Sequence, residues 1–221
     1  IVSSACLEGL KNPQKQSNTS KPSAILAPAS VPAQVSVLQK FVVLDFDETL
    51  AFNHEIKTVA VTGDKSKLYD LLDDPKSIQS SNPYETMISV VTGLKRQGYS
   101  LMILTGRKEH LKNEIRTWIL SHFGIDIPNE DIICREADTK VSTALFKAEY
   151  LAGFTSVNPD ASIVFVDDAK ENLDAVEKSC PHVNLLLAKE GIMYPYAGCS
   201  FGSSDKNSKQ QSLARPIELL G

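Results

Sequence analysis

VLDFDETLAF, residues 43–52, is an apolar stretch interrupted by three closely spaced carboxylates, those of Asp45, Asp47 and Glu48. The run FVVLDF that leads into it, residues 41–46, is short, apolar and partly β-branched, which is typical of a buried strand. Carboxylates at the end of a buried strand repel one another and lose hydration, which destabilises a fold by several kcal/mol unless something compensates. The stretch is therefore either a solvated turn or a site for a positively charged ligand.

Short apolar runs alternate with amphipathic patterns through the central part of the chain. The runs predict core strands at 41–46, 99–104, 132–134, 162–166 and 183–188. The amphipathic segments predict helices at 82–98 (with Asn82 as its cap), 108–123, 141–151 and 168–177, and the alternating residues 55–62 predict a further strand or hairpin arm. Strands separated by helices favour an α/β fold, a three-layer Rossmann-like sandwich in which helices cover both faces of a central parallel sheet.

Polar side chains follow three of these expected strands at the point where each strand ends. Asp45 and Asp47 follow the first strand, the sequence TGR at 105–107 follows the second, and Asp167 and Asp168 follow the fourth. Ligands of parallel α/β sheets bind at the carboxyl ends of the strands, so these groups are expected to meet along one edge. This convergence favours a cation site over a solvated turn in the opening stretch.

Four segments of the chain, DFDET (45–49), LTGR (104–107), a lysine on a helix and FVDD (165–168), resemble in this order the motifs of the haloacid dehalogenase (HAD) superfamily, in its phosphatase branch. The resemblance extends over roughly residues 41–188. It implies a HAD-like fold and a Mg²⁺-dependent phosphomonoesterase that works through an aspartyl-phosphate intermediate. Two alternatives are a HAD-type phosphotransferase and a binding protein that keeps the site without turnover.

The resemblance also implies roles for individual residues. Asp45 is expected to attack phosphorus, and Asp47 to protonate the leaving oxygen and then activate water. The expected Mg²⁺ ligands are Asp45, Asp47 through its backbone carbonyl, Asp167, and Asp168 directly or through water. Mg²⁺ prefers such oxygen ligands, and its charge would compensate the crowded carboxylates of the first motif.

The phosphate-binding residues are expected to be Thr105, the backbone N–H of Gly106, and Lys147. Lys140 is the alternative to Lys147, because both lysines lie in the segment before the last motif. Arg107 has two interpretations of equal weight, a contact with the substrate phosphate or an ion pair with a nearby acid.

Two further polar residues stand beside the motifs. Glu48 occupies a position where many HAD relatives carry glycine, and Asn172 follows the last motif. Solvent exposure is the expectation for both residues. The alternatives are a contact with substrate or a neighbouring loop for Glu48, and orientation of the Asp168 carboxylate for Asn172.

Three parts are expected along the chain: an extended or disordered arm at 1–38, a HAD-like domain at 39–198 and a flexible tail at 199–221. The segment 51–76 has room for a small β-hairpin flap and one helix, but not for a full cap domain. An open site of this kind favours a bulky substrate, such as a nucleic-acid end, a nucleotide or a phosphoprotein. The segments around the later motifs are loosely similar to the HAD domains of nucleic-acid repair proteins, including polynucleotide kinase-phosphatases.

Composition and net charge limit the partners, the cysteine chemistry and the location expected for this chain. The net charge of −4 on 221 residues excludes a broad basic surface for long nucleic acid, and it leaves room for a phosphorylated substrate held by a few cations. The four cysteines are scattered, which favours free thiols over a metal or disulfide framework. No apolar run approaches the roughly 20 residues of a membrane span, so no membrane partner is expected. The expected location leans towards the cytoplasm, with the oligomeric state left open.

Overall fold

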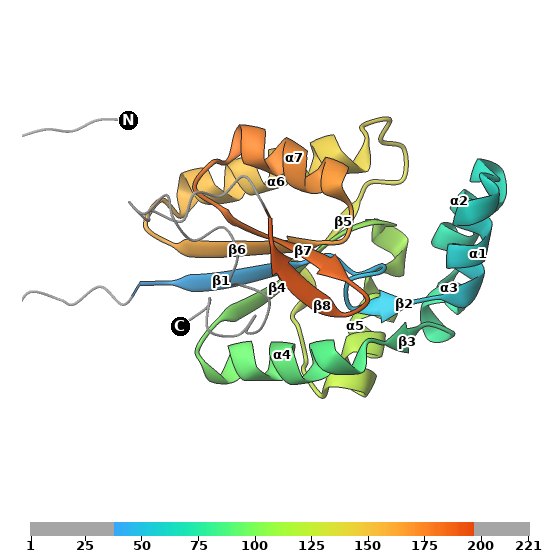
Figure 1. The fold of residues 1–221 in the computed structure, drawn as a ribbon, viewed down its shortest axis with the longest axis horizontal. Coiled ribbons are helices and arrows are strands. Elements are labelled where there is room, and N and C mark those ends of the chain that lie inside the picture. The colour runs from blue at the N-terminus through green and yellow to red at the C-terminus, as the bar shows by residue number, and fades with distance from the viewer. Residues whose placement is uncertain (1–37, 197–221) are drawn as a thin grey trace, which may run out of the picture. The chain divides into compact units, whose positions relative to one another are not determined.

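A computed structural model describes residues 38–196, in which a six-stranded sheet carries helices on both faces (Figure 1). The strands lie in the order β5-β4-β1-β6-β7-β8. Their bounds are Lys40–Leu44 for β1, Ser100–Lys108 for β4, Ile132–Arg135 for β5, Ser162–Asp167 for β6, Asn184–Lys189 for β7 and Ile192–Pro195 for β8. Neighbouring strands are parallel except β7 and β8, which form an antiparallel hairpin. The predicted α/β sandwich with a central, mostly parallel sheet is confirmed.

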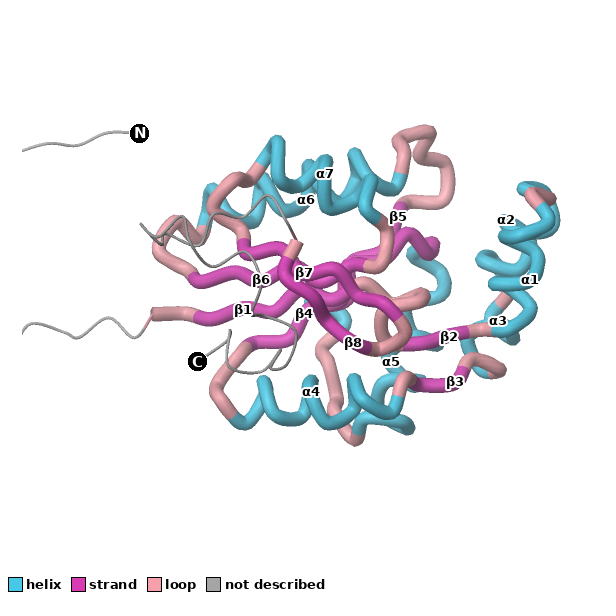
Figure 2. Tube along the Cα trace, viewed as in Figure 1, coloured by secondary structure: helices cyan, strands magenta, loops and turns pink. Residues whose placement is uncertain are grey.

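Helices α4 and α5 cover one face of the sheet, and α6 and α7 cover the other (Figure 2). Their bounds are Glu85–Arg96 for α4, Lys112–Phe123 for α5, Thr143–Val157 for α6 and Lys170–Ser179 for α7, and two 3-10 turns span Glu109–Leu111 (η1) and Asn129–Asp131 (η2). Residues 41–44 of β1 are all apolar, and the strand contacts both layers. Val42 and Leu44 belong to the core that includes residues of α4 and α5, whereas Val43 belongs to the core that includes residues of α6 and α7.

The predicted core elements agree with the structure except at some boundaries. The helix expected at 82–98 begins only at Glu85, because Asn82–Pro83 form the short strand β3. Tyr84, rather than Asn82, therefore occupies the position before this helix, and it provides no side-chain cap. Helix α6 continues beyond its predicted end to Val157.

The segment between β1 and α4 contains more helix than predicted. Two short strands, β2 (Ala51–Phe52) and β3, pair antiparallel, but 29 residues (53–81) separate them, so the β-hairpin expected within residues 51–76 is not present there. Three helices lie between these strands: α1 (His54–Thr62), α2 (Lys65–Asp73) and α3 (Pro75–Gln79). The strand predicted at 55–62 is therefore wrong. We call residues 53–81 the insertion; Figure 1 shows its helices beyond the carboxyl ends of β1 and β4.

Local hydrogen bonds explain why this segment is helical. The side-chain oxygen of Asn53 accepts hydrogen bonds from the N–H groups of Glu55 and Ile56, at 2.9 and 3.2 Å, and so caps the start of α1. Gly63 ends the helix with a φ of 75°, in the left-handed region that glycine adopts without strain. Ile56 and Val59, three residues apart, are the buried residues of α1, which is a helical spacing.

Strand β8 is absent from the sequence prediction because its turn has an unusual first residue. Glu190 and Gly191 connect β7 to β8 with φ values of 48° and 75°. Asn-Gly or Asp-Gly is the usual signal for such a two-residue turn, whereas Glu-Gly is not. A Cβ at Gly191 would lie 2.5 Å from Thr86 Oγ1 and 2.6 Å from Tyr84 Cβ, so packing against α4 also requires glycine here.

Several expectations fall on residues that the structure does not describe. The tail expected at 199–221, and all but the last residue of the arm expected at 1–38, lie outside the described residues, as do two of the four cysteines. The other two, Cys134 and Cys180, are buried free thiols, as expected. Within residues 38–196, none of the helices combines the length and the apolar character needed to cross a membrane.

Candidate active site

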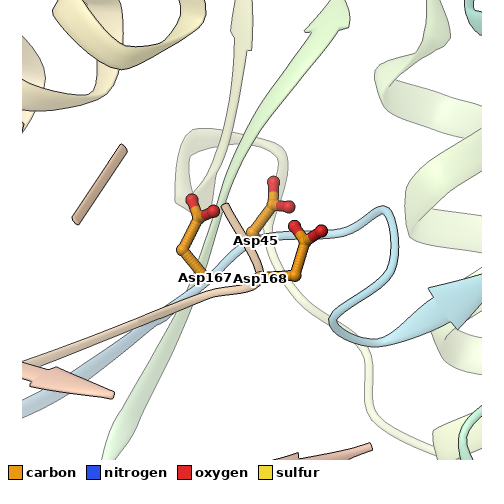
Figure 3. Close-up of side chains that lie close together, drawn as sticks. All are labelled: Asp45, Asp167 and Asp168. Carbon is orange, nitrogen blue, oxygen red and sulfur yellow. The ribbon is translucent and has the colours of Figure 1, made fainter. Parts of the chain in front are cut away.

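Three carboxylates meet at the carboxyl ends of β1 and β6. Asp45 follows β1, Asp167 is the last residue of β6, and Asp168 comes next. One oxygen from each lies within 4.8 Å of the other two, and Figure 3 shows the three carboxylate groups directed towards one region. The N–H of Asp45 donates to the carbonyl of Val166 at 2.9 Å, so pairing with β6 continues past the end of β1 and fixes Asp45. The fold thus brings together side chains that are far apart in the sequence.

The ammonium group of Lys147, on α6, bridges two of these carboxylates. Its Nζ donates to Asp45 Oδ1 at 2.6 Å and to Asp167 Oδ2 at 2.7 Å. Burial by itself favours the neutral amine, but the two carboxylates outweigh burial and raise the pKa of Lys147. Lys147 is 1% exposed, whereas Lys140 lies on the surface. Of the two lysines considered from the sequence, the structure places Lys147 at the carboxylate cluster.

The cluster carries more negative than positive charge. Burial raises the pKa of Asp45 well above its ordinary value, and the ammonium group of Lys147 offsets this only in part. Burial, followed by the charge of Asp167, raises the pKa of Asp168 to about 7. A lysine that neutralises one charge among three carboxylates leaves a site that attracts a further cation.

Asn172 orients one of the carboxylates. Its side-chain amide donates to both oxygens of Asp167, at 2.9 and 3.0 Å, and the N–H of Ala169 adds a hydrogen bond of 2.9 Å to Asp167 Oδ1. Asn172 is buried, so the expected exposure of this side chain is wrong, and its partner is Asp167 rather than Asp168. Its place in the first turn of α7, directly after the last motif, is the sequence signal that could have identified this role.

Asp47 is held by an arginine from the neighbouring strand β4. Arg107 donates from Nε to Asp47 Oδ2 at 2.9 Å and from Nη2 to Asp47 Oδ1 at 2.7 Å. Its Nη1 donates to the carbonyl of Leu72 at 3.0 Å and to Ser77 Oγ at 2.6 Å, which links Asp47 to the insertion. The side chain of Arg107 is fully buried, and that of Asp47 is 27% exposed. Of the two interpretations of Arg107, the structure therefore supports the ion pair with a nearby acid.

Thr105 and Gly106 lie where β4 passes the cluster. Gly106 lines the cavity beside Asp45, whereas Thr105 is fully buried and its Oγ1 accepts a hydrogen bond of 3.2 Å from the N–H of Arg107. A Cβ at Gly106 would lie 3.0 Å from Cγ2 of Thr143, the first residue of α6. Glycine therefore lets α6 approach β4 closely and leaves the backbone of Gly106 accessible to a ligand.

Glu48 contacts a neighbouring loop, one of the alternatives considered from the sequence. Its carboxylate accepts a hydrogen bond of 3.0 Å from the hydroxyl of Tyr84 and lies 3.9 Å from Nζ of Lys57. Burial, followed by the charge of Glu48, raises the pKa of Tyr84. Glu48 has a φ of 55°, a conformation that glycine adopts more readily than glutamate.

A cavity of about 380 Å³ opens at the cluster. Asp45, Asp47, Asp168 and Lys147 line its inner part. Helix α2 of the insertion provides another wall, formed by Tyr69, Asp70, Leu72 and Asp73. The insertion thus encloses the site more than the predicted hairpin and single helix would have done.

Comparisons with known proteins find solved structures with a similar fold but no family model or curated protein that matches the sequence. A chain from each of two structures of the Pnkp1/Rnl/Hen1 complex, described in one of them as an RNA repair complex, aligns with TM-scores of 0.51 and 0.52 and identities of 18% and 17%. The alignments cover 69% of this chain but only 43% and 46% of those chains, so this chain spans less than half of their length. A haloacid dehalogenase-like hydrolase from Streptococcus pneumoniae aligns with a TM-score of 0.44 and 12% identity, over 68% of this chain and 84% of its own.

The chain shares its α/β fold with the aligned part of the two Pnkp1/Rnl/Hen1 chains. The four motif segments that resemble those of the HAD phosphatases lie at the ends of β1, β4 and β6 and on α6. In this fold residues from all four segments line the cavity.

The residues of this site fit a Mg²⁺ ion. Mg²⁺ binds hard oxygen donors, commonly one or two carboxylates together with substrate phosphate and water. Three carboxylates with oxygens within 4.8 Å of one another supply such donors, and burial raises the pKa values of Asp45 and Asp168, so a bound cation would stabilise their ionised forms. Asp45, Asp167 and Asp168 are the residues that would hold the ion.

The raised pKa values predict how pH affects the stability of the metal-free protein. Asp168 titrates near 7 in the folded protein and near its ordinary value of about 4 in the unfolded chain, so between these values the folded protein binds more protons. The free energy of unfolding should therefore fall as pH rises from about 5 to about 8, by an amount on the order of 2 kcal/mol.

Urea denaturation in EDTA across this pH range measures the effect. Because Mg²⁺ replaces the proton, stabilisation by MgCl2 should be larger at the upper end of the range than at the lower end. Asp168→Asn should flatten the pH dependence. A stability that stays constant or increases with pH in EDTA would contradict the prediction.

Proposed function

We propose that the protein is a Mg²⁺-dependent phosphomonoester hydrolase that acts through a phosphorylated Asp45. One observation carries the proposal. Asp45, Asp167 and Asp168 converge at the strand ends, and Lys147 donates to two of them, beside a cavity that is open to a ligand. A phosphate ester and a carboxylate nucleophile are both anionic, so their reaction needs positive charge at this place, which Lys147 supplies in part and a cation bound by the carboxylates would complete.

The first half of the reaction transfers the phosphoryl group to the protein. The Asp45 carboxylate attacks phosphorus, the bond from phosphorus to the ester oxygen breaks, and Asp47 donates a proton to the leaving oxygen. Bound Mg²⁺ would neutralise part of the negative charge of the phosphoryl group and of the carboxylates. Lys147 holds Asp45 in position from α6, and the N–H of Gly106 and the hydroxyl of Thr105 are the proposed donors to the phosphoryl oxygens.

The second half releases phosphate. Asp47, now ionised, takes a proton from a water molecule, and that water attacks the phosphorus of the aspartyl-phosphate. The bond between phosphorus and the Asp45 oxygen breaks, which restores the free carboxylate. The hydrogen bonds from Arg107 keep the Asp47 carboxylate at the mouth of the cavity through both steps.

The proposed substrates are phosphomonoesters with a sizeable leaving group: a nucleic-acid end, a nucleotide or a phosphoprotein. The cavity of about 380 Å³ has room for part of such a group, and α2 shields only one side of it. The repair-complex structures that share the fold make a phosphorylated nucleic-acid end the first substrate to test.

Removal of metal tests the proposed function directly. The folded protein should hydrolyse an aryl phosphate such as p-nitrophenyl phosphate in MgCl2, and EDTA should lower the rate by at least about 100-fold, because several kcal/mol of charge stabilisation in the transition state are lost. Restoring MgCl2 should restore the rate, with circular dichroism as the control for folding. Equal and negligible turnover with and without metal, across aryl phosphates and phosphorylated oligonucleotides, would refute the proposal and favour a binding protein that retains the site.

A further inference from the structure

Four cationic side chains line the cavity: Arg107, Lys108, Arg135 and Lys147. Three of them are already paired with acids. Arg107 binds Asp47, Lys108 lies 2.6 Å from Asp73, and Lys147 bridges Asp45 and Asp167. Among the described residues, no carboxylate lies within ion-pair distance of Arg135. Arg135 is therefore the cation of this cavity whose charge is left for a ligand.

The position of Arg135 is set by its neighbours. It is the last residue of β5 and pairs with Lys108 of β4 across the sheet. Its Nη1 donates to Thr143 Oγ1 at 3.1 Å, and Thr143 in turn packs against Gly106. Nε of Arg135 is buried within the described part of the chain and has no hydrogen-bond partner there. An unpaired buried donor costs free energy, which a bound acceptor would recover.

We propose that Arg135 binds a second anionic group of the substrate, located on the leaving-group side of the reacting phosphoryl group. The proposal rests on the proposed function, since the first anionic group is the phosphomonoester at Asp45. The proposed donors to the first group are the N–H of Gly106 and the hydroxyl of Thr105, and Arg135, whose Nη1 donates to Thr143 Oγ1, lies outside this set.

The charges that line the cavity favour one side of it for the second anion. Helix α2 presents Asp70 to the cavity on the side of the insertion, where its carboxylate would repel another anion, whereas Asp73 beside it is already paired with Lys108. Arg135 stands at the end of β5, where its guanidinium can form two parallel hydrogen bonds to phosphate oxygens. The chemistry that fits is a second phosphate or a phosphodiester, as in a small bisphosphate or in the internucleotide linkage next to a phosphorylated strand end.

Binding of non-hydrolysable ligands tests this inference without requiring turnover. Propylphosphonate carries one anionic group, and propane-1,3-diphosphonate adds a second at the other end of the same chain. In calorimetric titrations with an excess of MgCl2, the wild type should bind the diphosphonate at least about 10-fold more tightly than the monophosphonate, as expected for one charge-assisted interaction. In Arg135→Gln this preference should fall to about twofold or less.

Two further variants separate a ligand contact from a structural effect. Arg135→Lys keeps the charge and should retain part of the preference. Lys108→Gln removes a cation of the same cavity that already has an acidic partner, and it should keep the full preference. Thermal melts report the folding of each variant. A wild type without preference, or an Arg135→Gln protein that melts normally and keeps the wild-type preference, would overturn the inference.

Competition against the diphosphonate distinguishes whether the second anion belongs to a nucleic-acid end or to a small bisphosphate. A thymidine dinucleotide that carries a 3′-phosphate contains a phosphodiester that thymidine 3′-monophosphate lacks. If the dinucleotide competes better than the mononucleotide, and only when Arg135 is present, the site binds a nucleic-acid end. If only the diphosphonate depends on Arg135, the site binds a small bisphosphate. A wild type that binds these ligands as expected but hydrolyses no phosphomonoester would refute the proposed function and leave the second-anion site standing.

Discussion

Replacing Asp45 by asparagine should abolish phosphomonoesterase activity and leave the protein folded. The amide of asparagine has nearly the same shape as the carboxylate, but it is not a nucleophile and it binds Mg²⁺ poorly. We expect kcat to fall by about 10⁴-fold or more, as for other enzymes that lose the nucleophile of a covalent mechanism. Hydrolysis of an aryl phosphate in MgCl2, with protein free of wild-type contamination, measures the loss.

The same substitution should not lower stability. Burial raises the pKa of Asp45, which means that the fold bears a free-energy cost for holding this carboxylate ionised. Asparagine removes that charge, and its side-chain oxygen can still accept a hydrogen bond from Lys147. The melting temperature of metal-free Asp45→Asn should equal or exceed that of the wild type. Asp126→Asn, at an exposed carboxylate, is the matched control and should retain wild-type turnover. Full activity of Asp45→Asn would exclude a covalent role for Asp45.

Replacing Arg107 by methionine should reduce both stability and activity. The change leaves Asp47, the carbonyl of Leu72 and the hydroxyl of Ser77 without their common partner. Breaking a buried ion pair by removing one partner destabilises by about 3–5 kcal/mol, and the partial exposure of Asp47 brings the expected value to about 3 kcal/mol. For a chain of this size the melting temperature should fall by about 6–12 °C.

The effect of Arg107→Met on turnover should depend on the leaving group. Arg107 acts through Asp47, the proposed proton donor, so the loss should be about 100-fold or more in kcat for an alkyl phosphate, whose leaving oxygen needs a proton. The loss should be smaller for p-nitrophenyl phosphate, because nitrophenolate leaves without one. A purely structural role would lower both rates equally, which would contradict the positioning role. Arg116→Gln removes an exposed bidentate pair with Asp126 and is the matched control, with little change expected in melting temperature or rate.

The layered architecture could be predicted because its signals are local. Continuous apolar runs such as 162–166 identify strands buried on both faces, and the left-handed glycine at 124 ends α5 where the sequence analysis placed the end. The insertion could not be predicted equally well. Residues 55–62 alternate like a strand, and only the cap at Asn53 and the packing of Ile56 and Val59 select the helix.

The carboxylate cluster was accessible to sequence reasoning because parallel strands bring their carboxyl ends to one edge. The side-chain contacts that hold and surround this cluster could not be predicted from the sequence. Arg107 contacts Asp47 across 60 residues, Lys147 contacts Asp45 across 102, and Nη1 of Arg135 reaches the hydroxyl of Thr143, all through side-chain directions that no local pattern encodes. Lys140 and Lys147 lie in the same short segment, and the sequence does not show which of them is buried. Only the folded structure shows that Lys147 is buried and Lys140 is exposed.

The order of apolar runs and acidic strand ends determined the sheet, its layers and the edge where a cation and a phosphate ester would meet, because these features depend on periodicity and on the direction of parallel strands. Tertiary structure alone decided which charges are neutralised and which remain open to a ligand. Charge pairing depends on distances of a few ångströms between side chains from different elements, and those distances exist only once the sheet, α6 and the insertion have packed together.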